Sequence, residues 1–210
     1  MESCCSLHVL VALMLILQSS NYHINASSSA STRPLNLHKT DTQYIKTSCK
    51  ATTYPKLCYT SLSVYADKIK TDPQLLASAA LNLSLAATRA ASTVMNRLSK
   101  FHGLKPTVAA AVLDCVEMIG DSVDELQQSV AEMGRASCGE SDFGLLMDDI
   151  ETWVSAAMTD ADTCMDGFDE HGLHGRVKNV VRRYVVKVAH LTSNALALIN
   201  SYASTKSSSP

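Results

Sequence analysis

The sequence predicts an all-α protein: an up-down-up-down bundle of four long helices, preceded by a short N-terminal helical hairpin and held by two disulfides. In four segments beyond residue 72, apolar residues recur at alternating spacings of four and three. These spacings average 3.5 residues, the period of helices that pack at a shallow crossing angle. Aromatic residues make up only 5% of the chain, so Ala, Val, Leu and Met must fill the core. Short connections favour antiparallel neighbours.

Residues 1–26 are predicted to be a signal peptide, with cleavage somewhere between residues 20 and 30. Leu7 to Leu17 is an apolar run of signal-peptide length, about half of what a membrane span needs. No basic residue precedes the run, and a signal anchor is the alternative. Residues 27–37 form a Ser-rich segment expected to be flexible. The helical-bundle domain is placed at 38–203, and 204–210 are expected to be a disordered tail.

A short helical hairpin is expected over residues 41–59. Pro55 disfavours helix at the preceding Tyr54, so the chain should turn there. Cys49 and Cys58 flank this turn, and a disulfide between them would close a small loop. Chain-entropy models give about 2–3 kcal/mol for so short a loop.

Each long helix has its own start signal. The first two begin at Pro73 and Pro106, the third is capped by Ser141 or Asp142, and the fourth follows the loop 172–175. These repeated breaks argue against the alternative of one long dimeric coiled coil. The expected core row of the first helix is Leu76, Ala80, Leu83, Ala87, Ala90 and Val94.

The other three helices have equally regular apolar rows. On the second helix the row is Val108, Val112, Cys115, Ile119, Val123, Leu126, Val130 and Met133. On the third helix it is Phe143, Met147, Ile150, Val154, Ala157, Ala161, Cys164 and Phe168. On the fourth helix it is Val177, Val181, Tyr184, Val188, Leu191, Ala195, Leu198 and Tyr202.

Cys115 and Cys164 lie almost symmetrically about the turn-rich stretch 134–142, and each falls on the core row of its helix. If the two helices are antiparallel, these cysteines lie at the same height and a disulfide would join them. Five cysteines remain after signal removal, so at most two intrachain bridges form. The fifth, Cys138, is placed in a loop as a free thiol or an intermolecular bridge. A disulfide framework indicates a secreted protein.

Two sequons mark candidate N-glycosylation sites. Asn82 is followed by Leu83 and Ser84, and Asn25 by Ala26 and Ser27. Cleavage after residue 26 would remove the site at Asn25.

Charge is strongly segregated along the chain. Residues 107–170 carry sixteen acidic residues and one basic residue, whereas 33–106 carry eleven basic and three acidic and 171–210 carry six basic and none acidic. In an up-down bundle one side would therefore be acidic and the opposite side basic. Either the two sides simply attract each other, or the field steers an oppositely charged partner. Glu117, Asp121 and Asp124 share one helix face, opposite the core row.

Motifs of catalysis are missing. The chain has no P-loop, paired CxxC, GxSxG or HExxH pattern, so no catalytic residue, metal, cofactor or nucleic-acid partner is expected. His171 and His174 are interpreted as surface histidines, and Asp160 and Asp162 as solvated carboxylates.

Four segments resemble the plant invertase and pectin methylesterase inhibitor family. They are Cys49–Cys58, then Leu113–Glu117 with Asp121, Asp124 and Leu126, then Trp153–Ala157 with Thr163–Phe168, and finally Leu191–Leu198. The last one favours the pectin methylesterase inhibitor branch. Ile119 and Ser122 stand where the family usually has Tyr and Ala.

This resemblance implies a non-catalytic, secreted apoplast or cell-wall protein with bridges Cys49–Cys58 and Cys115–Cys164. It implies a one-to-one complex with pectin methylesterase over the substrate cleft, limiting demethylesterification of cell-wall pectin. The implied enzyme-binding residues are Glu117, Asp121, Asp124, Thr163 and Asp166. An inhibitor of cell-wall or vacuolar acid invertase is the first alternative. A non-inhibitory wall protein that binds pectin through its basic side is the second. No membrane contact is expected after signal cleavage.

Overall fold

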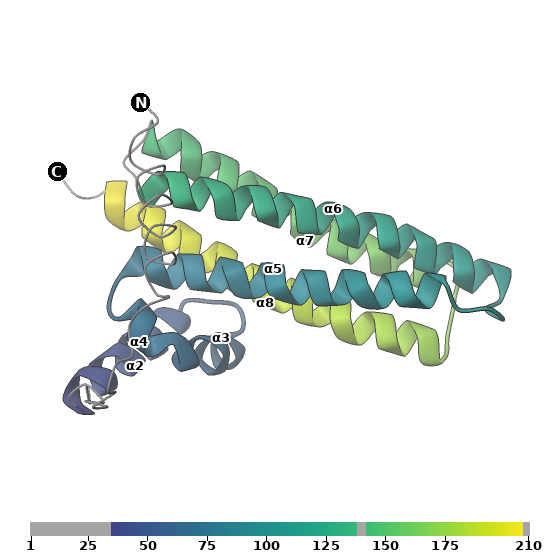
Figure 1. Cartoon of the computed structure of the whole chain (residues 1–210), viewed down its shortest axis with the longest axis horizontal. Coiled ribbons are helices and arrows are strands. Elements are labelled where there is room, and N and C mark those ends of the chain that lie inside the picture. Colours follow the sequence, from purple (N-terminus) through teal and green to yellow (C-terminus); the bar gives the residue numbers. More distant parts are fainter. Residues whose placement is uncertain (1–34, 138–141, 208–210) are drawn as a thin grey trace, which may run out of the picture.

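The structure is a computed structural model that describes residues 35–137 and 142–207 (Figure 1). The predicted signal peptide, most of the Ser-rich segment, Asn25 and Cys138 lie outside the described residues.

Short helices precede the bundle: α2 (Leu35–Cys49), α3 (Pro55–Leu62), the 3₁₀ turn η1 (Ser63–Tyr65) and α4 (Ala66–Ile69). Together they form the expected N-terminal hairpin and its continuation. They pack against one end of the bundle, with α3 contacting both α5 and α8.

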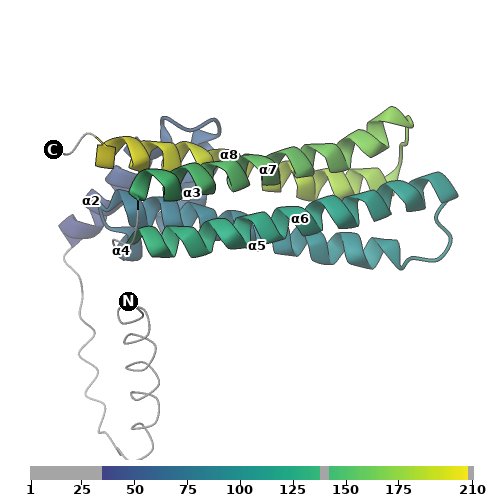
Figure 2. The same ribbon diagram turned by 90° about the horizontal axis from the view of Figure 1, so that it is seen from above.

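Four long helices form the bundle: α5 (Pro73–Ser99), α6 (Pro106–Ser137), α7 (Phe143–Glu170) and α8 (Arg176–Ser207). The contacting pairs α5–α6, α6–α7, α7–α8 and α5–α8 close a ring, and Figure 2 shows the helices side by side along the long axis. The predicted all-α up-down-up-down bundle is confirmed. Helix α8 continues to Ser207, so residues 204–207, expected in a disordered tail, are helical.

Aspartate caps start α5 and α7. The Asp72 carboxylate accepts hydrogen bonds from the backbone N–H groups of Gln74 and Leu75, at 2.8 and 3.0 Å. Of the two predicted caps for the third helix, Asp142 serves, accepting from Gly144 N–H at 3.0 Å. Both aspartates bind N–H groups that have no partner inside the helix and lie at its positive dipole end.

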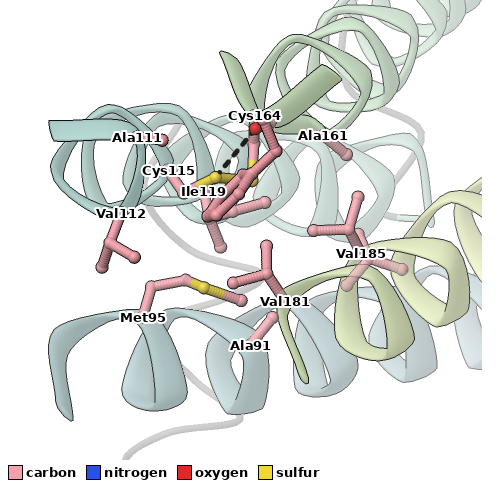
Figure 3. Close-up of a cluster of buried hydrophobic side chains, with 12 residues drawn as sticks. Ala91, Met95, Ala111, Val112, Cys115, Ile119, Ala161, Cys164, Val181 and Val185 are labelled. Atoms are coloured by element: carbon pink, nitrogen blue, oxygen red, sulfur yellow. Dashed lines mark hydrogen bonds between the residues drawn. A yellow bond between two sulfur atoms is a disulfide. The ribbon is translucent and has the colours of Figure 1, made fainter. Parts of the chain in front are cut away.

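The apolar rows of α6, α7 and α8 pack where the spacing predicts. The residues that line the interior around Cys115 and Cys164 come from all four helices, including Met95, Val112, Ala161 and Val181 (Figure 3). Tyr202 packs edge-on against Phe143 at the other end, with ring centroids 5.6 Å apart.

The predicted core row of α5 holds only in part beyond Ala80: Leu83 and Ala87 pack against the core while only partly buried, and Ala90 is exposed. The fully buried positions of α5 include Ala77, Leu81, Ser84, Leu85, Thr88, Ala91 and Met95. Ser84 and Thr88 donate hydrogen bonds to backbone carbonyls four residues earlier, at 3.1 and 2.9 Å. With their hydroxyls satisfied inside the helix, these side chains can face the core at little cost.

The Cys49–Cys58 bridge forms as expected, with Cα atoms 5.6 Å apart. The loop that it closes is fastened to α8 by Asn194, which is only 2% exposed. The Asn194 side chain accepts from Tyr54 N–H at 2.9 Å and donates to the Tyr54 carbonyl at 3.1 Å. One buried amide therefore satisfies both backbone groups of Tyr54 and docks the hairpin.

Within residues 35–137 and 142–207, none of the helices combines the length and the apolar character that a bilayer crossing requires.

Candidate functional site

A disulfide fixes α6 against α7. Cys115 and Cys164 are bridged, as the sequence predicts, and their Cα atoms are only 4.5 Å apart. The dashed line in Figure 3 joins Cys115 Sγ to the Cys164 carbonyl oxygen at 3.0 Å. A bridged sulfur has no proton to donate, so this is a close sulfur–oxygen contact produced by the tight helix approach. The bridge sets the height at which side chains of the two helices meet.

The predicted enzyme-binding residues all lie on the solvent side of this helix pair. All five are exposed: Glu117, Asp121 and Asp124 on α6, and Thr163 and Asp166 on α7. On α6 the spacing of four and three residues keeps the carboxylates on one face. On α7 the two residues flank Cys164, and Glu117 lies two residues from Cys115, so these three lie near the bridge. Asp121 and Asp124 follow further along α6.

Asp124 is linked to a third helix through a chain of hydrogen bonds. Gln127 donates to the Asp124 carboxylate at 3.0 Å. Arg89 of α5 in turn donates to the side-chain amide oxygen of Gln127, Oε1, at 2.6 Å. Asp124 thus has a restricted orientation. Among the described residues, the carboxylates of Glu117, Asp121 and Asp166 accept no comparable bond, and they are free to meet a partner.

The two departures from the family pattern lie beneath this face. Ile119 is fully buried. Ser122 is also buried, and its hydroxyl lies 3.1 Å from the carbonyl oxygens of Met118 and Ala157. Because Ala157 is on α7, Ser122 adds a polar link between the helices without reaching the exposed face.

Glu125 and Asp160 form a carboxyl pair across α6 and α7. Burial raises the pKa of Glu125 to about 7, with further contributions from Asp160 and then Asp121. Burial also raises the pKa of Asp160. As two carboxylates the pair has no proton to share, and Glu125 Oε2 is then buried without a hydrogen-bond partner. One proton between them provides the missing donor.

The sequence reasoning missed this pair. It interpreted Asp160 as an ordinary solvated carboxylate, whereas the structure places Asp160 half-buried against Glu125. A usable signal was that Glu125 is adjacent to the core residue Leu126, at the edge of the apolar row.

The described residues contain no group of three or more His, Cys, Asp or Glu side chains arranged to hold a metal ion.

Comparisons with known proteins agree with this architecture. The family model described as plant invertase/pectin methylesterase inhibitor matches residues 43–198. The chain is 52% identical over 170 residues to pectinesterase inhibitor 10 of Arabidopsis thaliana, covering 80% of this chain and 54% of that one. It is 42% identical over 203 residues to pectinesterase inhibitor 9 of the same plant, covering 95% and 94%.

A solved structure is similar in fold. The crystal structure of a mutant form of a pectin methylesterase inhibitor from Arabidopsis superposes with a TM-score of 0.60 at 20% identity, covering 74% of this chain and 95% of that one.

Proposed function

The chain belongs to the plant invertase/pectin methylesterase inhibitor family, and from that premise we propose that it inhibits a pectin methylesterase. The exposed face of α6 and α7 that carries Glu117, Asp121, Asp124, Thr163 and Asp166 covers the enzyme's substrate cleft in a one-to-one complex and excludes pectin. The family consists of inhibitors rather than enzymes, so the expected action is steric block and not catalysis.

The observation that carries the proposal is a rigid, exposed acidic surface centred on the Cys115–Cys164 bridge. A protein interface benefits from groups held in place before binding, because less conformational freedom is lost on association. The disulfide holds the two helices, and Arg89 with Gln127 orients Asp124. A cleft that receives a polymer of galacturonate must accommodate carboxylates, which gives the acidic row a chemical reason.

The two disulfides support an extracellular location for this inhibitor. Disulfides persist in oxidising compartments, and both bridges are formed here. With the signal-like apolar run at residues 7–17, they support a secreted protein of the apoplast or cell wall, where esterified pectin is found.

The test is a methanol-release assay of purified pectin methylesterase titrated with the secreted protein. We expect stoichiometric inhibition by the wild type. We expect the double reversal Asp121→Lys with Asp124→Lys to weaken inhibition by about tenfold or more. Complementary charges speed the encounter of two proteins and fix how they align, and this variant reverses the charges on the inhibitor's side. Circular dichroism checks that the helices persist, as expected for two exposed positions.

A matched control reverses two exposed carboxylates of α7 outside the proposed set, Asp148→Lys with Glu170→Lys. It changes net charge equally and is expected to inhibit like the wild type. Equal loss in both variants would show that net charge matters and the Asp121–Asp124 row does not. Inhibition of an acid invertase but not of the esterase, in a parallel titration, would favour the invertase alternative.

A further inference from the structure

Basic side chains form a row along the outer face of α8, away from the acidic helices. Arg176 and Arg183 are seven residues apart, and His190 is seven further on. Two helical turns separate each pair, so the three lie nearly in line, about 10 Å apart. Lys187 lies between the last two, one turn beyond Arg183. Arg176, Arg183 and Lys187 are all exposed.

The row ends at an aromatic stack beside an open depression. The His190 ring stacks on the Tyr54 ring, with centroids 3.6 Å apart and planes inclined by 22°. Tyr54 is held there by its two backbone bonds to Asn194. Beyond the stack lies a depression of about 510 Å³ lined by Thr53, Tyr54, Pro55, Lys56, Leu57 and Thr60. Lys56 is exposed there and adds a further positive charge.

Little inside the protein neutralises this row. Helices α3, α5 and α8 contain no Asp or Glu. Among the described residues, no ion pair engages Arg176, Arg183, Lys187 or Lys56, and Arg183 lies 5.6 Å from the ring of Tyr184 in a cation–π contact. By contrast Lys178, on another side of α8, pairs with Asp169 of α7. The row is thus an uncompensated positive strip on an exposed surface.

We propose that this α8 row, with the depression at Tyr54 and Lys56, binds de-esterified pectin, an acidic polysaccharide with one carboxylate on each unesterified sugar. Lys and Arg pair with the carboxylates along the strand, and the depression accepts a sugar ring beside the aromatic stack. The choice of this polyanion rests on the proposed function, since pectin methylesterase generates these carboxylates. The acidic face and the α8 row lie on different sides of the bundle, so the inhibitor can hold enzyme and product polymer together.

The experiment measures binding of the secreted protein to polygalacturonate in the absence of any enzyme, by calorimetry or affinity electrophoresis. We expect the wild type to bind at low salt and to be released as salt rises. We expect Arg183→Glu with Lys187→Glu to bind at least about tenfold more weakly, since two attractive contacts become repulsive. Fully methyl-esterified pectin, which lacks the carboxylates, should not bind.

The matched control is Lys46→Glu with Lys68→Glu, two exposed lysines on α2 and α4, and it should bind like the wild type. No binding by the wild type, equal loss in both variants, or equal binding of esterified pectin would each overturn the proposal. The methanol-release assay separates the two functions. If the variant Arg183→Glu with Lys187→Glu still inhibits the enzyme, the α8 row serves polymer binding and not inhibition. If the wild type binds polygalacturonate normally but does not inhibit the enzyme, only the proposed function is overturned.

Discussion

Glu125 shows how one side chain acquires properties that its sequence neighbours do not reveal. It is partly buried between α6 and α7, faces Asp160, and has a pKa raised to about 7 by burial and then by that carboxyl. In the unfolded chain its pKa returns to the ordinary value near 4.5. The folded state therefore binds a proton more tightly than the unfolded state between these two values. The free energy of unfolding must therefore decrease as pH rises through this interval.

We predict that Glu125→Gln stabilises the protein at pH 8 and removes most of the stability change between pH 4.5 and pH 7. The amide cannot ionise and can donate to Asp160. The gain at pH 8 is on the order of 1–2 kcal/mol after allowing for solvent that still reaches the pair. Urea unfolding at several pH values measures it, with the exposed Asp162→Asn as control. A variant that follows the wild-type pH profile would contradict the assignment.

At the scale of elements, α8 has two roles. Its inner row fills the bundle core, and its Asn194 fastens the N-terminal hairpin through Tyr54. Ser193 adds a hydrogen bond to Thr53 at 3.1 Å. The α3 helix therefore depends on a residue 140 positions away in sequence, beyond what the local Cys49–Cys58 bridge provides.

We predict that Asn194→Ala destabilises the fold by about 1–3 kcal/mol, because Tyr54 N–H loses its acceptor in a half-buried site. The Tyr54 carbonyl loses one donor but still accepts from Cys58 N–H at 2.9 Å. Denaturant unfolding measures the loss, and proteolysis within residues 50–54 should become faster. Asn179→Ala, at an exposed position on the same helix, should change stability little. If both variants were equally stable, the Asn194 contact would not dock the hairpin.

The sequence predicted the buried face of a helix well where apolar residues form one clear row, and poorly where they do not. On α7 every predicted row residue from Met147 to Phe168 is buried. On α5, alanines are so frequent that two adjacent faces carry similar rows. The buried face there uses Ser84 and Thr88, whose polarity argued against it until their backbone hydrogen bonds were visible.

The same contrast applies to the candidate site. Both disulfide pairs and the exposure of the acidic row followed from spacing and charge. Side-chain contacts between helices could not be predicted from the sequence, because they depend on the relative rotation and height of two helices. Examples are Arg89–Gln127–Asp124 and Glu125–Asp160. That rotation is set by the core side chains together.

At the scale of the whole molecule, charge divides the bundle into two faces. Helices α6 and α7 carry 14 of the 20 acidic residues, whereas α5 and α8 carry none. The ion pairs seen among the described residues, such as Lys178 with Asp169, use few of these charges. Exposed pairs contribute about 0–1 kcal/mol each, so the separation is better explained by what the two faces attract.

We predict that association with pectin methylesterase is steered by this field. The association rate should fall about tenfold or more between low and high ionic strength, while the dissociation rate changes much less. Stopped-flow or surface-binding kinetics across salt concentrations measures both rates. Asp121→Lys with Asp124→Lys should flatten the salt dependence. An association rate indifferent to salt would show that the acidic face has no steering role.

The Cys115–Cys164 bridge encloses a long covalent ring, since 49 positions separate its ends. Any single backbone cut between residues 116 and 163 opens that ring but yields no separate fragments. The two halves remain attached through sulfur. A cut after Asp124 and before Thr163 leaves the proposed contact residues of α6 on one half and those of α7 on the other. An inhibitor exposed to extracellular proteases can in this way be nicked once and still act as one molecule.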